Sequence, residues 1–225
     1  MQVRNSSHSR GEVIVDSLSR IYPPIKTPLQ HSTPFQLLIA TILSAQTTDV
    51  QVNRISSALF SRYPDAASMS KASISTLEKI VHSTGFFHVK AQRIREVSRT
   101  IMKEFGGNVP ETMVGLLRFP GVGRKTANMV LSAGFDRIEG IAVDTHVRRL
   151  SQRLGLSSSS DPEKIEQDLM NIIPMELWPK ISILLILHGR SICYARAPDC
   201  FRCVLSSTCK YFRENKEKMN RSHVS

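Results

Sequence analysis

Apolar residues recur three or four positions apart through most of this 225-residue chain, and helix-starting residues precede several of these segments. A side-chain oxygen followed by a proline or by a periodic apolar run is typical of a helix start. Examples are Thr33 with Pro34, Ser73, and Asp161 with Pro162. No segment alternates apolar and polar residues over a useful length, as a half-buried strand would. The pattern predicts an all-α fold.

The order of these signals predicts a succession of helices joined by short polar loops. Asp49 and Asp144 are expected to cap the helices that follow them. Residues 214–225 are expected to form a frayed charged tail. The helices are expected over about 34–45, 50–60, 74–81, 89–105, 110–117, 124–134, 145–154, 162–172 and 177–193.

The charge balance is strongly basic, with 30 Lys and Arg against 19 Asp and Glu and a formal net charge of +11. This surplus favours binding to a polyanion, with nucleic acid as the first candidate, although charge for solubility alone is the alternative. The polar first ten residues lack the apolar stretch of a signal peptide, and no apolar run approaches the length of a membrane span. We expect a cytoplasmic, nucleoid-associated monomer that binds no membrane.

The sequence FPGVGRKTA at residues 119–127 lies between two expected helices. Its two glycines allow backbone angles that a side chain would forbid, which is typical of a helix-hairpin-helix. The open N–H groups at the start of the second helix can bind a DNA phosphate, although a plain helix end and turn is the alternative. The expected DNA contacts are Gly121, Val122, Gly123, Arg124 and Thr126.

Lys125 follows in the first turn of that helix, where the positive end of the helix dipole favours a neutral amine. A neutral amine is a nucleophile and can form a Schiff base with a sugar carbon. Asp144 stands directly before the next helix, where a carboxylate accepts backbone N–H bonds. Each residue also has a simpler interpretation, since Lys125 could only contact phosphate and Asp144 could only cap its helix.

All four cysteines lie in one short segment with the spacing Cys193-x6-Cys200-x2-Cys203-x5-Cys209. Disulfide frameworks spread their cysteines through a small secreted chain, so this clustering points to a metal centre. Zinc and a cubane iron–sulfur cluster both accept four thiolates. Structural zinc usually uses two close pairs of cysteines, and only Cys200 and Cys203 form one here.

Four motifs resemble, in order and in spacing, those of the endonuclease III family of DNA glycosylases. They are LSAQTTD at 43–49, LRFPGVGRKTAN at 117–128, AVDTHV at 142–147 and LHGR at 187–190. The resemblance implies an all-helical fold of two lobes with DNA in the cleft between them. Residues 27–137 would form a six-helix barrel lobe, and residues 1–26 with 138–213 an iron–sulfur lobe.

The resemblance also implies the chemistry. The damaged nucleotide is flipped out of the duplex, Lys125 attacks its sugar, Asp144 faces Lys125 across the cleft, and β-elimination through the Schiff base cuts the strand. The family acts on oxidised pyrimidines and abasic sites in duplex DNA, and its four cysteines hold a [4Fe–4S] cluster. Gln46 corresponds to the residue that fills the gap left by the flipped base. Phe86 corresponds to the wedge on the opposite strand, where an aliphatic residue is expected.

Two other functions stay open on the sequence. A mismatch-type glycosylase of the same superfamily would not need Lys125. An adenine-removing one would need an acidic residue near Gln46, and residues 37–46 contain none. A non-catalytic DNA-binding module would need only the hairpin and the basic surface.

Overall fold

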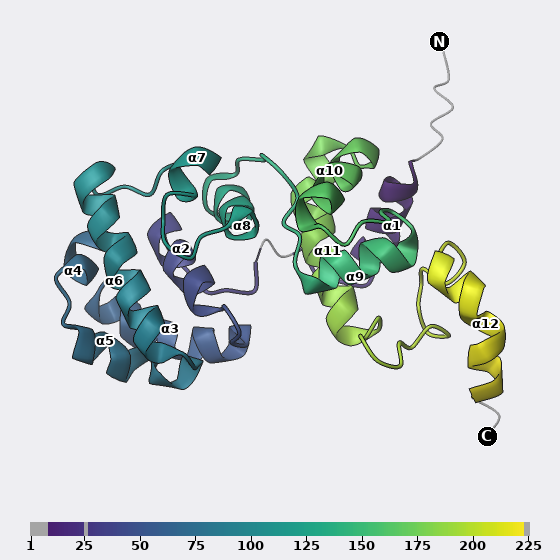
Figure 1. Cartoon of the computed structure of the whole chain (residues 1–225), viewed down its shortest axis with the longest axis horizontal. Helices are drawn as coiled ribbons and strands as arrows, with labels where there is room; N and C mark the ends of the chain where they lie inside the picture. The colour runs from purple at the N-terminus through teal and green to yellow at the C-terminus, as the bar shows by residue number, and fades with distance from the viewer. Residues whose placement is uncertain (1–8, 25–26, 223–225) are drawn as a thin grey trace, which may run out of the picture. The chain divides into compact units, whose positions relative to one another are not determined.

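The computed structural model describes residues 9–24 and 27–222, and every regular element within these ranges is a helix (Figure 1). The all-α prediction is therefore confirmed. None of the described helices is both long and apolar enough to cross a bilayer. The elements are α1 (Arg10–Ser19), α2 (Pro34–Leu43), α3 (Asp49–Arg62), α4 (Ala66–Ser70), α5 (Ile74–Val81), the 3-10 turn η1 (His82–Thr84), α6 (Phe87–Glu104), α7 (Met113–Leu116), α8 (Arg124–Phe135), α9 (Thr145–Leu154), α10 (Pro162–Ile172), the 3-10 turn η2 (Met175–Leu177), α11 (Trp178–Ser191) and α12 (Lys210–Ser222).

Side-chain caps explain where many of these helices begin. The Thr33 hydroxyl accepts a hydrogen bond from a backbone N–H in the first turn of α2, directly before the proline that opens the helix. Ser73 and Asp161 cap α5 and α10 in the same way, as the sequence predicts. The prediction for α3 is wrong by one residue. Thr48 is the cap and Asp49 is the first helical residue, because the Thr48 hydroxyl takes the free N–H.

The chain divides into two compact units, each with its own hydrophobic core. The continuous unit is Thr27–Glu139 and holds α2 to α8, coloured blue to teal in Figure 1. The discontinuous unit joins the described residues 9–24 to residues 140–222 and holds α1 and α9 to α12. The resemblance implies a break after residue 137, whereas the two units divide after residue 139.

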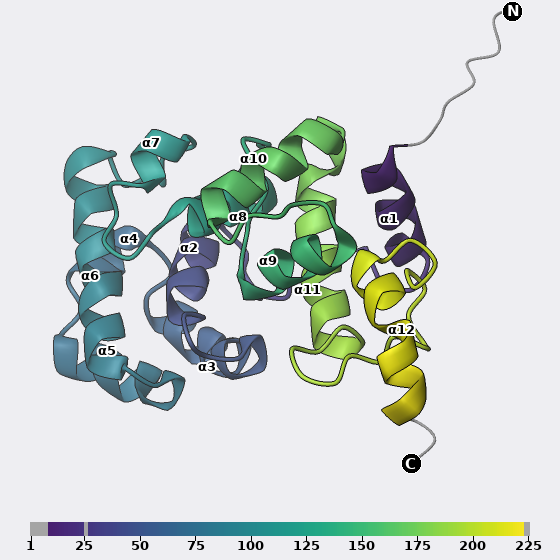
Figure 2. The same cartoon turned by 45° about the vertical axis from the view of Figure 1, so that its right-hand side comes forward.

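In the continuous unit, α2 is the central helix. Phe35 and all residues from Leu37 to Leu43 are buried. The helix packs against α3, α6 and α8, and α6 packs in turn against α4 and α5 (Figure 2). The segment that follows α2 and the helix α8 are therefore both attached to one buried helix.

In the discontinuous unit, α11 packs against α9 and α1, and α10 also contacts both of these helices. The N-terminal helix is joined to residues far along the chain, because the Arg10 guanidinium donates to the Thr208 carbonyl at 2.9 Å. This long-range pairing makes the unit discontinuous in sequence.

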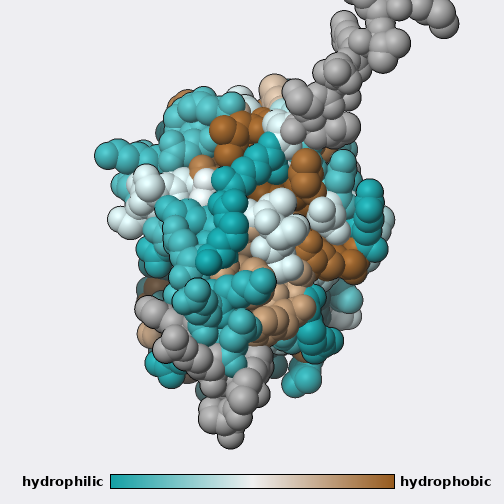
Figure 3. Space-filling view, turned by 90° about the vertical axis from the view of Figure 1, so that its right-hand side faces the viewer, coloured by the Kyte–Doolittle hydropathy of each residue, from teal (hydrophilic) through white to brown (hydrophobic). Residues whose placement is uncertain are grey.

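The frayed tail expected over residues 214–225 is wrong for the residues described, because α12 is helical from Lys210 to Ser222. Two contacts hold its first turn. The Phe212 ring meets the Phe201 ring edge-on at 5.6 Å, and the Arg153 guanidinium lies 4.7 Å from the centre of the Tyr211 ring. The face seen from the α12 side is mainly hydrophilic, with small separate apolar patches (Figure 3).

Candidate functional site

A tight hairpin joins α7 to α8 in the continuous unit. Gly121 has a φ of +82°, a left-handed conformation that glycine adopts without strain. The N–H of Val122 donates to the carbonyl of Phe119 at 3.1 Å, and both side chains are buried. Apolar contacts therefore fix the turn from the inside.

The helix after the hairpin begins without a side-chain cap. Its N-cap is Gly123, so no side chain satisfies the first N–H groups of α8. Lys125 is exposed in the first turn, and no described residue makes a hydrogen bond or ion pair with it. Arg124 is also exposed, and Thr126 is partly buried. An anion that approaches this end of α8 meets backbone donors, the helix dipole and full positive charge together.

A third cation, Arg93 on α6, lies against the same turn. A methyl group at Gly121 would sit 3.2 Å from the Cδ of Arg93 and 3.4 Å from its Nε and Nη1. Arg93 is exposed, and no described residue forms an ion pair with it. Sequence reasoning missed this residue because it belongs to a helix outside the hairpin motif.

Both loops that the sequence singles out as DNA-inserting lie in the continuous unit. Gln46 follows α2 with a φ of +55°, and Phe86 precedes α6 with a φ of +47°. Such left-handed backbone is uncommon for a residue other than glycine and most unusual for a bulky side chain. Gln46 is exposed and Phe86 is 68% exposed. The Thr47 hydroxyl donates to the Thr84 carbonyl, so the two loops contact each other.

Asp144 is the N-cap of α9 in the discontinuous unit. Its Oδ1 accepts the N–H groups of His146 and Val147, each at 2.8 Å. No described residue makes a hydrogen bond with its Oδ2. Asp144 therefore caps α9, as predicted, and it does so with one of its two carboxylate oxygens.

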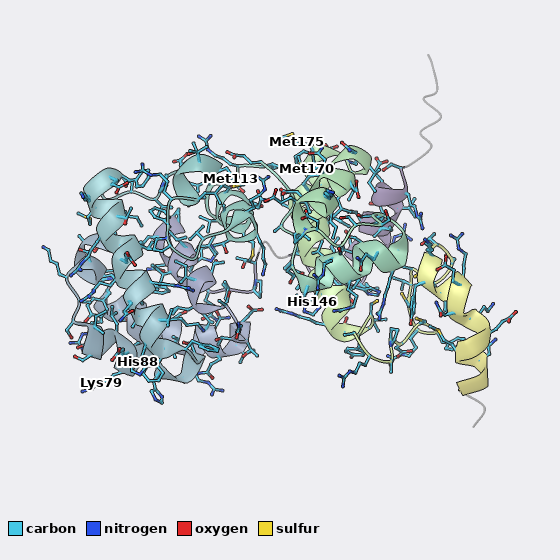
Figure 4. The ribbon with its side chains drawn as sticks, in the orientation of Figure 1. Lys79, His88, Met113, His146, Met170 and Met175 are labelled. Atoms are coloured by element: carbon cyan, nitrogen blue, oxygen red, sulfur yellow. The ribbon has the colours of Figure 1, made fainter. Side chains whose placement is uncertain are left out.

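The helix that Asp144 caps, α9, also contacts the cysteine loop, which is the segment 192–209 between α11 and α12. Arg149 donates to the Cys193 carbonyl at 2.9 Å, and Arg153 donates to the carbonyls of the two residues after Cys193. His146 lies in the first turn of α9 (Figure 4), with its Nδ1 3.1 Å from the Arg149 guanidinium. Burial lowers the pKa of His146 below its ordinary value. One helix thus links the Asp144 carboxylate to the loop.

The four cysteines line one pocket beside α9 and α11, and none forms a disulfide. Cys200 and Cys209 are buried, and Cys193 and Cys203 are partly buried. Burial raises the pKa of the Cys200 thiol and raises that of Cys203 to about 11, so both keep their protons unless a cation binds the sulfur. Among the described residues, no three His, Cys, Asp or Glu side chains are arranged to hold a single metal ion.

Hydrogen-bond donors lie at the sulfur atoms of Cys193 and Cys203. The Leu205 N–H donates to the Cys203 Sγ at 3.4 Å, and the Arg153 guanidinium donates to the Cys193 Sγ at 3.2 Å. The Nε2 of His188 is 3.2 Å from the Cys203 Sγ, and burial lowers the pKa of His188 to about 4, so its ring is neutral at pH 7. Donors of this kind favour thiolate ligands over neutral thiols.

The predicted site residues fall into two groups, one in each unit. The continuous unit holds Lys125, the other hairpin residues and the loops of Gln46 and Phe86. The discontinuous unit holds Asp144 and the four cysteines, which α9 connects.

Comparisons with known proteins agree with these features. Residues 39–175 match the HhH-GPD superfamily of base excision DNA repair proteins. Over 204 residues the chain is 49% identical to endonuclease III of Synechocystis sp., a match that covers 91% of this chain and 93% of that protein. It is also similar to a solved non-covalent endonuclease III–DNA complex and to a trapped endonuclease III–DNA covalent intermediate with an estranged adenine. Their TM-scores are 0.85 and 0.84, each at 36% identity over 91% of this chain and 96% of theirs.

Proposed function

This chain belongs to the HhH-GPD superfamily of base excision DNA repair proteins and to its endonuclease III family, and from that premise we propose that it removes oxidised pyrimidines and cleaves the abasic site through a Schiff base on Lys125. It is a DNA glycosylase and abasic-site lyase whose partner is duplex DNA. The observation that carries the choice of nucleophile is the exposed Lys125 amine, unpaired among the described residues, at the uncapped start of α8.

In the proposed reaction, the Lys125 nitrogen attacks C1′ of an extruded nucleotide. The bond between C1′ and the base breaks, and the base leaves with the bonding electrons and takes up a proton. The nitrogen loses a proton and the ring oxygen O4′ takes one up, so that the bond between C1′ and O4′ breaks and the sugar opens to a protonated Schiff base. Removal of a proton from C2′ then expels the 3′ phosphate and cuts the strand, and water later releases the sugar remnant from Lys125.

We assign Asp144 to the stabilisation of charge on the sugar. Its Oδ1 is occupied by the first turn of α9, whereas its Oδ2 has no partner among the described residues. A carboxylate oxygen held at a fixed helix terminus favours the positive charge that develops as the base departs, because it needs little rearrangement at that moment.

We assign the hairpin and the two loops to DNA binding. Gly121, Val122 and Gly123 shape the turn so that the N–H groups of α8 can meet a phosphate, and Arg124 and Thr126 add side-chain donors. Gln46 would fill the gap left by the extruded nucleotide, and Phe86 would wedge into the opposite strand. The exposure of both side chains supports these roles.

We assign the four cysteines to a [4Fe–4S] cluster. The thiols share one pocket, and hydrogen-bond donors lie at the sulfur atoms of Cys193 and Cys203. Only Cys200 and Cys203 form the close pair in sequence that structural zinc uses twice, so the spacing suits a cluster better than one zinc ion. When bound, the cluster would cross-link the loop, and the loop carbonyls would then hold Arg149 and Arg153 of α9.

The decisive experiment is replacement of the proposed nucleophile. We expect Lys125→Ala to lower strand cleavage by about 1000-fold or more and to remove the covalent enzyme–DNA adduct that borohydride traps, while most duplex binding remains. Lys79→Ala, which removes an exposed lysine of α5 (Figure 4), is the matched control and should keep both activities. An undiminished adduct in the Lys125→Ala variant would contradict the assignment.

A panel of duplexes tests the substrate. Base release and strand cleavage should be scored separately on oxidised pyrimidines, a thymine mismatch and a preformed abasic site. We expect both reactions on oxidised pyrimidines. Base release without any trapped adduct would instead indicate a monofunctional, mismatch-type enzyme.

A further inference from the structure

Lys90, in the first turn of α6, is a buried cation without a counter-charge. The residue is only 3% exposed, and no described carboxylate pairs with it. Burial lowers the pKa of its amine. A buried ammonium costs free energy unless it is well hydrogen-bonded, and the start of a helix adds an unfavourable dipole. Stabilisation of the fold therefore does not explain why a lysine occupies this buried position.

The amine joins the two loops that carry Gln46 and Phe86. Its Nζ donates to the Thr47 hydroxyl oxygen and to the Thr84 carbonyl, each at 2.7 Å. Thr47 directly follows Gln46, and Thr84 is separated from Phe86 only by Gly85. Lysine thus contributes two hydrogen bonds to neutral oxygens, one in each loop.

Both loops have backbone conformations that need such support. A left-handed conformation at a residue other than glycine costs about 1–3 kcal/mol and persists when the surroundings hold it. The backbone N–H of Lys90 also donates to the Phe86 carbonyl at 3.0 Å. The Thr47 hydroxyl donates to the Thr84 carbonyl, and the Gln51 amide donates to the Ser83 hydroxyl at 2.5 Å, so further bonds join the same two parts of the chain.

We propose that Lys90 is a positioning residue that couples the Gln46 loop to the Phe86 loop, so that both side chains enter the duplex together when a nucleotide is extruded. This inference rests on the proposed function, because it takes both side chains to be DNA-inserting. Lys90 acts through the loops and does not touch the reacting sugar.

The test compares two substrates that differ in the need for extrusion. A duplex with an oxidised pyrimidine must unstack a base, whereas a duplex with a preformed abasic site has no base to unstack. In single-turnover reactions we expect Lys90→Met to lower base release by about 10- to 100-fold, a loss typical of misplaced positioning groups. Cleavage of the abasic duplex should change by less than about threefold, because the unstacking step is absent.

A spectroscopic readout separates positioning from loss of stability. With 2-aminopurine beside the lesion, the fluorescence increase on binding should be slower in Lys90→Met than in the wild-type protein. The control is Val97→Ala, which opens a cavity under the same helix without touching either loop. It should lower the thermal stability but keep the ratio of the two rates.

Thr47→Val removes the hydroxyl that links the loops while Lys90 stays in place. If Lys90→Met fails to fold, Thr47→Val allows the same comparison of base release with cleavage of the abasic duplex. An equal fall of both rates, or unchanged base release, in the folded variant would overturn the role of Lys90. Absence of base release in the wild-type protein on every oxidised pyrimidine would instead defeat the proposed function itself.

Discussion

The two carboxylate oxygens of Asp144 have different partners, and this allows its structural role to be separated from its proposed chemical role. Oδ1 accepts two backbone N–H bonds, and Oδ2 accepts none from the described residues. Asparagine caps a helix about as well as aspartate, whereas alanine does not. We expect Asp144→Asn to change the free energy of unfolding by less than about 0.5 kcal/mol, and Asp144→Ala to lower it by about 1 kcal/mol.

Base release should respond differently to the same two substitutions. Both variants lack the negative charge, so both should release base about 100-fold more slowly or worse. Urea unfolding and single-turnover base release on one lesion duplex measure the two effects. An Asp144→Asn variant that keeps wild-type base release would show that Asp144 is only a helix cap.

Arg93 is expected to extend the proposed phosphate contact of the hairpin. Its side chain occupies the space that the missing side chain of Gly121 leaves free. We expect Arg93→Gln to weaken binding to all duplexes alike and to reduce the slope of log affinity against log salt by about one. Arg99→Gln is the matched control, because Arg99 lies on the same helix but donates to the Ser70 carbonyl. Equal slopes for both variants and the wild type would contradict the contact.

The residues that could be found from the sequence are those whose chemistry lies in a local pattern. Lys125, Asp144 and the cysteine spacing are of this kind. Arg93 and Lys90 are not, since each acquires its meaning from a partner in another loop or turn of the fold. The positive φ of Gln46 was equally hidden, because glutamine itself does not signal a left-handed conformation.

The packing of α9 against α11 depends on a glycine at their crossing. A methyl group at Gly189 would lie 2.8 Å from the His146 Nδ1, 2.9 Å from the Arg149 Nη2 and 3.1 Å from the His146 Cβ. We expect Gly189→Ala to lower the free energy of unfolding by about 1–3 kcal/mol, as overpacking does. It should also slow base release, because the displaced helix is the one that Asp144 caps.

Gly134→Ala is the matched control within a helix. Its added methyl group would meet only ordinary contacts, the nearest being the Leu37 side chain at 3.4 Å. Alanine is the better helix former by about 0.5–1 kcal/mol, so this variant should be slightly more stable. If chemical unfolding shows the same change in the free energy of unfolding for Gly189→Ala and Gly134→Ala, the helix crossing at Gly189 has room for a methyl group.

Helix starts were predictable where one side chain determines them. Thr33, Ser73 and Asp161 are such caps, and each forms its expected bond. The sequence does not predict the helix α12, because two contacts that hold its first turn come from outside the helix. Phe201 lies in the preceding loop, and Arg153 lies on α9, far away in the sequence.

The discontinuous unit could not be derived from periodicity alone. Apolar spacing predicts that a segment is helical but does not tell which distant helix it meets. The bond from Arg10 to the Thr208 carbonyl joins residues near opposite ends of the chain, and only the family resemblance implied such a pairing. The two units have separate cores, and every cysteine lies outside the core of the continuous unit.

Loss of the proposed cluster should therefore loosen the discontinuous unit and spare the continuous one. Arg149 and Arg153 connect α9 to carbonyls of the loop, and we expect those carbonyls to keep their places only while the proposed cluster holds the loop. We expect Cys203→Ser to lose its visible absorbance and to lower amide hydrogen-exchange protection in α9 and α11. Protection in α2 and α6 should stay near the wild-type level, because no residue of the loop belongs to their core. A uniform loss over both units would mean that they unfold as one, whereas unchanged α9 would mean that the loop does not support Asp144.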